Sequence, residues 1–351
     1  MESLNQQDID PPCFDEFKNK RQRSVVDPNP GISKCRESGE SSSGQWSEET
    51  NITTEIMMSQ EEEDKDVTES SPCESYGSIS VIGRRRVMKD AVVVTKLNSH
   101  YFFAVYDGHG DSSVSNACRD RLHHLLAQEA EPRMLGGRGA AGRVDWEKVL
   151  TSCFTKMDDE VGAAASDAGG SVNTVGTSAV VAIVGNEEIV VANSGNSRVV
   201  LCRNGVVVPL SRDHNPDRPD EKQRVEAAGG RVIDWKGHRV LGVLSTSRSI
   251  GDHYLKPYVI SDPEVTVSKR NGSCDFLLVA SDGLWDVVSN EFACQVVTRC
   301  LSTQIKRRCA EGVTGGPAAN AAALLAQLAL ARGSKDNITV IVVELSKSVT
   351  N

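Results

Sequence analysis

The sequence predicts an α+β domain in which antiparallel strands and helices pack in layers. Seven apolar runs are rich in β-branched residues and end near Gly, Asn or Asp, which is typical of strands. Helical patterns lie between some of these runs without strict alternation, which disfavours a parallel α/β sheet. Two runs separated by "SGNS" (194–197) predict a β-hairpin and therefore antiparallel pairing.

The individual elements follow from local composition. Strands are predicted at 90–97, 101–107, 178–185, 188–195, 198–205, 276–283 and 337–345. Helices are predicted at 112–130, 145–161, 219–230, 289–301 and 317–333. Asp145 and Ser289 stand where an N-cap is expected, and Pro219 occupies a first-turn position.

The amino-acid composition divides the chain of 351 residues into a tail and a folded domain. Residues 1–75 are poor in large apolar side chains and contain the acidic run 61–66. Such a segment buries too little surface to offset its ordering entropy, so we predict a disordered acidic tail. The folded domain is predicted over 76–346.

Composition narrows the class of function. The formal net charge of −9 argues against nucleic-acid binding, and no apolar run reaches the roughly 18 residues of a membrane span. Ten cysteines without a Cys-x-x-Cys pair, and no secretory signal, predict an intracellular protein. The basic run 18–23 is read as a solvated charged segment or as a nuclear address. We expect the protein to be located in the nucleus and the cytoplasm.

Three aspartates stand at predicted strand ends far apart in the sequence: Asp107, Asp282 and Asp336. Each alone is more often a turn or cap residue. If they meet at one rim of a sheet, they repel one another and require a cation between them. Their oxygen donors suit Mg²⁺ or Mn²⁺, and two such ions activate water for attack on phosphorus. Gly108 lacks a Cβ, which lets its carbonyl approach a metal closely.

Four blocks carry a family resemblance: "VYDGHG" (105–110), "TSRSIGD" (246–252), "ASDGLWDV" (280–287) and "GSKDNITVIVV" (333–343). They resemble, in order, the signature blocks of the metal-dependent type 2C serine/threonine protein phosphatases. The resemblance implies a two-sheet antiparallel β-sandwich flanked by helices, with two Mn²⁺ or Mg²⁺ ions at one end. It also implies hydrolysis of phosphoserine and phosphothreonine by a metal-activated water, and we expect a monomer.

The resemblance also implies roles for the metal ligands. Asp107 would bridge both metals, and Gly108 would offer its carbonyl to one of them. Asp282 and Asp336 would complete the shell of the other metal.

Three further residues receive catalytic roles from the resemblance. Arg85 would hold the substrate phosphate through its planar guanidinium. His109 would protonate the leaving serine or threonine oxygen, although a lone histidine after a strand is more often structural. Asp90 would orient metal-bound water.

The chain departs from the family pattern at four positions. Lys89 stands where the family reads Glu, and Asn196 replaces an aspartate linked to a third, weaker metal in some relatives. Asp111 replaces a small residue, and Thr246 replaces a common Met. Lys89 and Asn196 favour an alternative function, a catalytically weakened binding protein that sequesters kinase or receptor.

A partner surface is predicted around Trp235, which lies between Asp234 and Lys236. A half-buried loop tryptophan and an interface anchor are both open readings. The segment resembles that of the plant type 2C phosphatases that act as abscisic-acid co-receptors. This resemblance implies that Trp235, with Arg239 and Gly110, contacts a hormone-bound receptor that inhibits the enzyme, whose substrates would be phosphorylated, stress-activated protein kinases.

Overall fold

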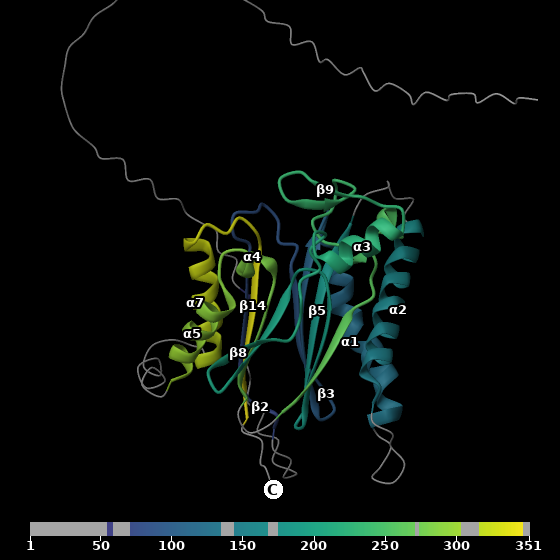
Figure 1. Cartoon of the computed structure of the whole chain (residues 1–351). Coiled ribbons are helices and arrows are strands. Elements are labelled where there is room, and N and C mark those ends of the chain that lie inside the picture. Colours follow the sequence, from purple (N-terminus) through teal and green to yellow (C-terminus); the bar gives the residue numbers. More distant parts are fainter. Residues whose placement is uncertain are drawn as a thin grey trace, which may run out of the picture. The chain divides into compact units, whose positions relative to one another are not determined.

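The computed structural model describes residues 55–58, 71–134, 144–167, 175–270, 274–302 and 316–346. Two antiparallel sheets pack face to face, and helices cover the outer face of each (Figure 1). The predicted α+β fold, a two-sheet antiparallel β-sandwich flanked by helices, is confirmed.

The first sheet contains six strands, which run in the order β1-β2-β14-β13-β7-β8. Their bounds are β1 Glu55–Met58, β2 Cys73–Val81, β14 Ile338–Leu345, β13 Cys274–Ala280, β7 Arg198–Arg203 and β8 Val206–Pro209. Its outer face packs against α4 Asp282–Trp285, α5 Asn290–Leu301 and α7 Pro317–Ala331.

The second sheet runs in the order β12-β6-β5-β4-β3, and the short strand β11 pairs with β5. Their bounds are β12 Glu264–Lys269, β6 Glu188–Ser194, β5 Gly176–Val184, β4 His100–His109, β3 Ala91–Leu97 and β11 Ile250–Gly251. Its outer face packs against α1 Ser113–Met134 and α2 Trp146–Asp167.

A smaller segment follows β8 in the chain. It contains helix α3 Pro219–Ala227, the two-stranded sheet of β9 Val232–Asp234 and β10 His238–Val240, and the 3₁₀ helix η1 His253–Leu255. In Figure 1 the label of β9 lies at the same end of the sandwich as that of α4.

The central strands are apolar throughout because both of their faces are buried. In β4, Phe102 and Tyr106 face the helices α1 and α2, whereas Phe103 and Val105 face the other sheet. All four side chains are fully buried. This two-sided burial explains why the sequence shows continuous apolar runs where a half-exposed strand would alternate.

The predicted N-caps are confirmed by hydrogen bonds. The Ser289 side chain accepts from Phe292 N at the start of α5, and Asp145 Oδ1 accepts from Lys148 N at 3.2 Å before α2. Both satisfy backbone donors that a helix start leaves unpaired.

The predicted hairpin at 188–205 is wrong. Its two strands, β6 and β7, belong to different sheets, so residues 194–197 cross from one sheet to the other. Local turn residues are the same in both arrangements, and the partner of each strand is set by distant segments. Antiparallel pairing still holds, because every pair of neighbouring strands within the sheets is antiparallel.

The predicted boundary between tail and domain falls inside a strand. β2 begins at Cys73, and Glu55–Met58 forms β1, which pairs with β2 from Glu55 opposite Ser80. Residues 1–54 and 59–70 of the predicted tail lie outside the described residues. None of the described helices combines the length and the apolar character needed to cross a membrane.

Candidate active site

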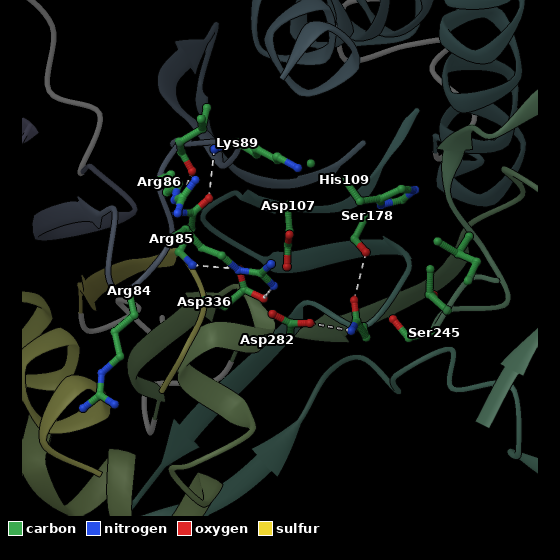
Figure 2. A pocket seen from close by; sticks show the side chains of 16 residues that line it. Arg84, Arg85, Arg86, Lys89, Asp107, His109, Ser178, Ser245, Asp282 and Asp336 are labelled. Carbon is green, nitrogen blue, oxygen red and sulfur yellow. Dashed lines mark hydrogen bonds and ion pairs between the residues drawn. The ribbon is translucent and has the colours of Figure 1, made fainter. Parts of the chain in front are cut away.

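A cavity of about 470 Å³ holds most of the predicted site residues. Asp107, Asp282 and Asp336 all line it, although the sequence separates the first from the last by more than 200 residues. Arg85 and His109 line it as well, and in Figure 2 they stand on opposite sides of the three carboxylates.

Strand pairing explains why Asp282 and Asp336 meet, whereas Asp107 comes from the other sheet. Asp107 is in β4, two residues before the strand ends at His109. Asp282 stands two residues after the end of β13, and Asp336 stands two residues before the start of β14, the antiparallel neighbour of β13. The end of one strand and the start of its antiparallel neighbour lie at the same edge of a sheet.

The carboxyl groups of Asp107 and Asp282 are close enough to share a hydrogen bond. Burial, followed by repulsion from Asp282 and Asp90, raises the pKa of Asp107 well above its usual range. Burial, with the charges of Asp286 and Asp336, raises the pKa of Asp282 to about 6. The two groups therefore favour a shared proton, or a cation in its place, over two bare charges.

The third carboxylate, Asp336, is held by Arg85. Arg85 Nε donates to Asp336 Oδ1 at 2.8 Å, and Nη2 donates to Oδ2 in a bidentate pair. Within the described residues, no three His, Cys, Asp or Glu side chains are gathered tightly enough to hold a metal ion alone. The site therefore contains two carboxyl groups that share a hydrogen bond and a third that is paired with an arginine.

The donor set nevertheless fits hard divalent cations. Asp107 and Asp282 provide oxygens only, and burial beside other carboxylates raises the pKa of both, which a bound cation would offset. Asp107, Asp282, Asp336 and the Gly108 carbonyl would hold the ions. When bound, two divalent cations neutralise the phosphate charge and lower the pKa of a water molecule for attack on phosphorus.

Gly108 is required here by packing. A Cβ at this position would lie 2.6 Å from the Lys89 carbonyl oxygen and 2.8 Å from Ser115 Oγ. Ser115 Oγ also donates to the Lys89 carbonyl at 2.6 Å. These two groups therefore leave no room for a side chain at position 108. This close contact is a second reason for glycine besides the predicted approach to a metal.

Asp90 lies behind the cavity wall. Its side chain is buried, and Asp90 Oδ2 accepts from Ser281 Oγ at 2.9 Å and Thr339 Oγ1 at 2.8 Å. Burial raises its pKa to about 7, although the two hydroxyl donors lower it. Asp90 therefore acts on the cavity through its charge, and its predicted contact with metal-bound water stays a prediction.

Three of the four departures from the family pattern line the cavity: Lys89, Asn196 and Thr246. Asn196 Nδ2 donates to Asp282 Oδ2 at 2.8 Å, and Ser178 Oγ donates to Asn196 Oδ1 at 2.9 Å. The ammonium of Lys89 donates to Gly110 O at 2.8 Å, which holds a cation at the cavity wall. Asn196 thus orients a candidate ligand, and Lys89 opposes the local negative charge.

Sequence reasoning missed Asp252, the last residue of the block 246–252. Asp252 Oδ2 lies 2.6 Å from His109 Nε2, and the Asp252 side chain is fully buried. Its position after glycine at the end of a signature block was the one signal available. No local pattern indicated that it meets His109.

The predicted partner residues lie outside the cavity or at its edge. Trp235 follows β9 and is 66% exposed. Arg239 is in β10, and its Nη1 donates to Val243 O at 2.8 Å. Gly110 is exposed directly after β4 and accepts the bond from Lys89.

Comparisons with known proteins agree with this geometry. A sequence profile of the family described as Protein phosphatase 2C matches residues 74–338. The chain is 54% identical over 304 residues to "Probable protein phosphatase 2C 8" of Oryza sativa subsp. japonica, covering 78% of this chain and 75% of that protein. It is 46% identical over 303 residues to "Protein phosphatase 2C 37" of Arabidopsis thaliana, covering 78% and 73%. The solved structure "Crystal structure of serine-threonine phosphatase 2C from Toxoplasma gondii" superposes with a TM-score of 0.67 at 22% identity, covering 84% of this chain and 99% of that chain.

The two-sheet sandwich and the acidic cavity at its end define a class, the metal-dependent protein phosphatases. The matched residues span nearly the whole folded part of the chain. The chain belongs to the protein phosphatase 2C family, whose members are serine/threonine protein phosphatases that generally depend on Mg²⁺ or Mn²⁺. The predicted family and enzyme class are confirmed.

Proposed function

We propose that this phosphatase restrains abscisic-acid signalling by dephosphorylating phosphoserine and phosphothreonine in stress-activated protein kinases. We propose further that a hormone-bound receptor inhibits it by covering the cavity. One observation carries the receptor proposal: a strongly exposed tryptophan stands on a segment that is hydrogen-bonded to the cavity wall.

The arrangement of the cavity supports the chemical part of the proposal. Arg85 carries a planar guanidinium that suits two oxygens of a phosphate. It is paired with Asp336 in the cavity that also holds Asp107 and Asp282. His109 lies across these carboxylates from Arg85. A phosphate bound between Arg85 and the carboxylate pair would leave its serine or threonine oxygen to the histidine.

The segment around Trp235 supports the receptor proposal. Ile233, Trp235, Leu241 and Val243 are exposed large apolar side chains close together in sequence. Such side chains gathered on one segment mark a site for a protein partner, and tryptophan is a frequent anchor of these sites.

This segment is connected to the cavity through backbone hydrogen bonds. Val240 N donates to Leu244 O at 2.8 Å, and Leu244, Ser245 and Thr246 line the cavity. The tryptophan and the cavity wall therefore belong to one hydrogen-bonded unit, and a partner that binds Trp235 would lie beside the entrance.

The activity is tested with a phosphothreonine peptide and the full chain, with and without Mn²⁺. We expect Mn²⁺-dependent turnover that Asp107→Ala abolishes. Turnover absent at every Mn²⁺ concentration would leave the alternative, a phosphatase-like protein that sequesters kinase or receptor. The ammonium of Lys89 at the cavity wall is the observation that favours this alternative.

The receptor proposal is tested by measuring inhibition by a hormone-bound receptor. Trp235→Ala should weaken the inhibition while leaving peptide turnover near the wild-type value. Val206→Ala is the matched control, because Val206 is 61% exposed but lies on β8, outside this segment. Equal inhibition of the two variants would remove Trp235 from the proposal.

We also propose that the protein is a monomer that acts in the nucleus and the cytoplasm. The basic run 18–23 supports nuclear entry by its composition, and it lies outside the described residues. Imaging of a fluorescent fusion, with the four Lys and Arg of this run replaced by Ala in a second version, tests the localisation.

A further inference from the structure

The side chain of His109 has a buried partner that the assigned chemistry of the site leaves unexplained. His109 Nε2 lies 2.6 Å from Asp252 Oδ2. The Asp252 side chain is fully buried, whereas His109 keeps 27% of its side chain exposed, at the wall of the cavity. A buried carboxylate thus stands directly behind a histidine that faces the reaction site.

Several contacts hold Asp252 in this position. Ser249 Oγ donates to Asp252 Oδ2 at 2.5 Å, and Asp252 N donates to Val175 O at 3.0 Å. The backbone of Asp252 has φ +48°, in the left-handed region that few non-glycine residues adopt. An uncommon backbone conformation that packing maintains indicates that this carboxylate is needed at this place.

The neighbouring strand leaves room for this contact. A Cβ on Gly176 would overlap Asp252 Oδ2 and would lie 2.8 Å from His109 Nε2. Gly176 pairs with His109 across β4 and β5 and with Gly251 across β11 and β5. The strand next to both residues therefore has its glycine where any side chain would separate them.

We propose that Asp252 is a positioning residue that fixes the ring orientation and the tautomer of His109. A carboxylate can only accept, so it holds the proton of His109 on Nε2. Nδ1 is then the ring nitrogen that exchanges a proton with the substrate. This inference rests on the proposed function, in which His109 protonates the leaving oxygen.

The proton transfer that follows from this arrangement is balanced. As the bond between phosphorus and the serine or threonine oxygen breaks, the proton on His109 Nδ1 passes to that oxygen. The ring is left neutral, with its remaining proton on Nε2 and directed at Asp252. The hydroxide part of the attacking water joins phosphorus, and its other proton restores the ring.

Two substrates separate positioning from structural support. A phosphothreonine peptide has a poor leaving group that needs the proton, whereas p-nitrophenyl phosphate has a good leaving group that does not. We expect Asp252→Asn to lower kcat for the peptide about 10- to 100-fold, as for other residues that orient a reacting group. The loss for p-nitrophenyl phosphate should be at least about tenfold smaller, and KM for the peptide should change little.

Asp158→Asn is the matched control. Asp158 is also a buried carboxylate, and its Oδ1 accepts from Gly251 N at 2.8 Å, so it supports the same loop. Within the described part of the chain, Asp158 contacts Gly251, Lys256 and His253 and does not bond to His109. This variant should lower the rates for the two substrates by the same factor.

A double-mutant cycle tests whether Asp252 acts through His109. His109→Gln should show the same difference between the substrates, and the double variant should lose no more peptide turnover than His109→Gln alone. Equal loss on both substrates for Asp252→Asn, or multiplied losses in the double variant, would overturn the proposal.

The wild-type protein provides a test that does not depend on the folding of a variant. In ¹⁵N-histidine NMR, one Nε2–H resonance should be protected from exchange with water, and it should disappear in His109→Gln. A spectrum without such a resonance contradicts the proposal. If wild-type enzyme with Mn²⁺ hydrolyses neither substrate, the proposed function fails, and this inference fails with it.

Discussion

Two groups of acidic side chains in this molecule have opposite electrostatic surroundings. In the cavity, Asp107 and Asp282 lie close together, and burial with repulsion from neighbouring aspartates raises the pKa of both. In α3, the side chain of Glu221 is almost fully buried, and it accepts hydrogen bonds from Arg248 Nη2 at 2.6 Å and Arg224 Nη2 at 2.8 Å. Burial alone raises the pKa of Glu221, but these donors outweigh it and hold the pKa well below the usual range.

The difference separates a functional site from a structural one. Glu221 has its compensating charges within the protein, so ionisation stabilises the fold. In the cavity, carboxylates lie close together without enough positive charge beside them, so they destabilise the fold until cations bind. The four experiments that follow test this contrast, beginning with the largest expected effect.

Asp107→Asn should affect activity and stability in opposite directions. Loss of a cation ligand removes several kcal/mol of transition-state stabilisation, so peptide turnover should fall by about 10³-fold or more. The unfolding free energy of the metal-free variant should rise by about 1 kcal/mol, because one of two repelling carboxyl groups is gone. Urea unfolding in EDTA measures the second quantity, and a less stable variant would contradict the contrast.

Glu221→Gln should lower the unfolding free energy by about 3–5 kcal/mol. The substitution leaves the partly buried guanidinium groups of Arg248 and Arg224 without their counter-charge. Urea unfolding measures the change. Glu226→Gln on the same helix is the control, because Glu226 is exposed and meets Lys222 at 3.9 Å, so its loss should cost less than about 0.5 kcal/mol. Similar losses for the two variants would show that Glu221 has no special role.

The pH dependence of the metal-free protein distinguishes the two groups by sign. A carboxyl whose folded pKa is raised binds more protons when folded, so its contribution to stability falls as pH rises between its unfolded and folded pKa values. For Asp282 this window runs from about 3.9 to about 6. Glu221 behaves oppositely, since its lowered pKa gives stability above the unfolded pKa that is lost as pH falls.

Comparison of wild type with Asp282→Asn isolates the first of these effects. Buried His214, whose pKa is lowered to about 4, also loses stability as pH falls below about 6.5, but it is common to both proteins. We expect the stability of Asp282→Asn relative to wild type, in EDTA, to increase by on the order of 2 kcal/mol from pH 4 to pH 7. A flat difference would mean that Asp282 ionises freely in the folded protein.

The fold was predictable where both faces of a strand are buried. The run Phe102–Tyr106 is apolar throughout because alternate side chains enter different parts of the core. The crossing at 194–197 was not predictable, because "SGNS" fits a hairpin and a crossing between sheets equally well. Which sheet the next strand joins depends on strands distant in the sequence.

The carboxylates of the site could be predicted from the sequence, but the contacts that hold the site residues could not. Asp107, Asp282 and Asp336 follow or precede apolar runs, so their position at one rim could be expected. The bond between Asp336 and Arg85 and the contact of His109 with Asp252 join segments more than 140 residues apart, without a local signal. Family resemblance supplied the role of Arg85 and omitted Asp252.

Lys89→Glu should produce the smallest change, in the affinity for Mn²⁺. The Lys89 ammonium lies at the cavity wall, where it repels a bound cation, and the substitution replaces this repulsion by attraction. Because the group is partly solvated, we expect about 1 kcal/mol, or roughly three- to tenfold tighter binding by titration calorimetry. Lys96→Glu is the matched control, since Lys96 is exposed at the other end of β3, and this variant should bind Mn²⁺ like wild type. Equal affinities in the two variants would show that Lys89 does not influence the cation site, and that the negative charge of the cavity is set by its carboxylates alone.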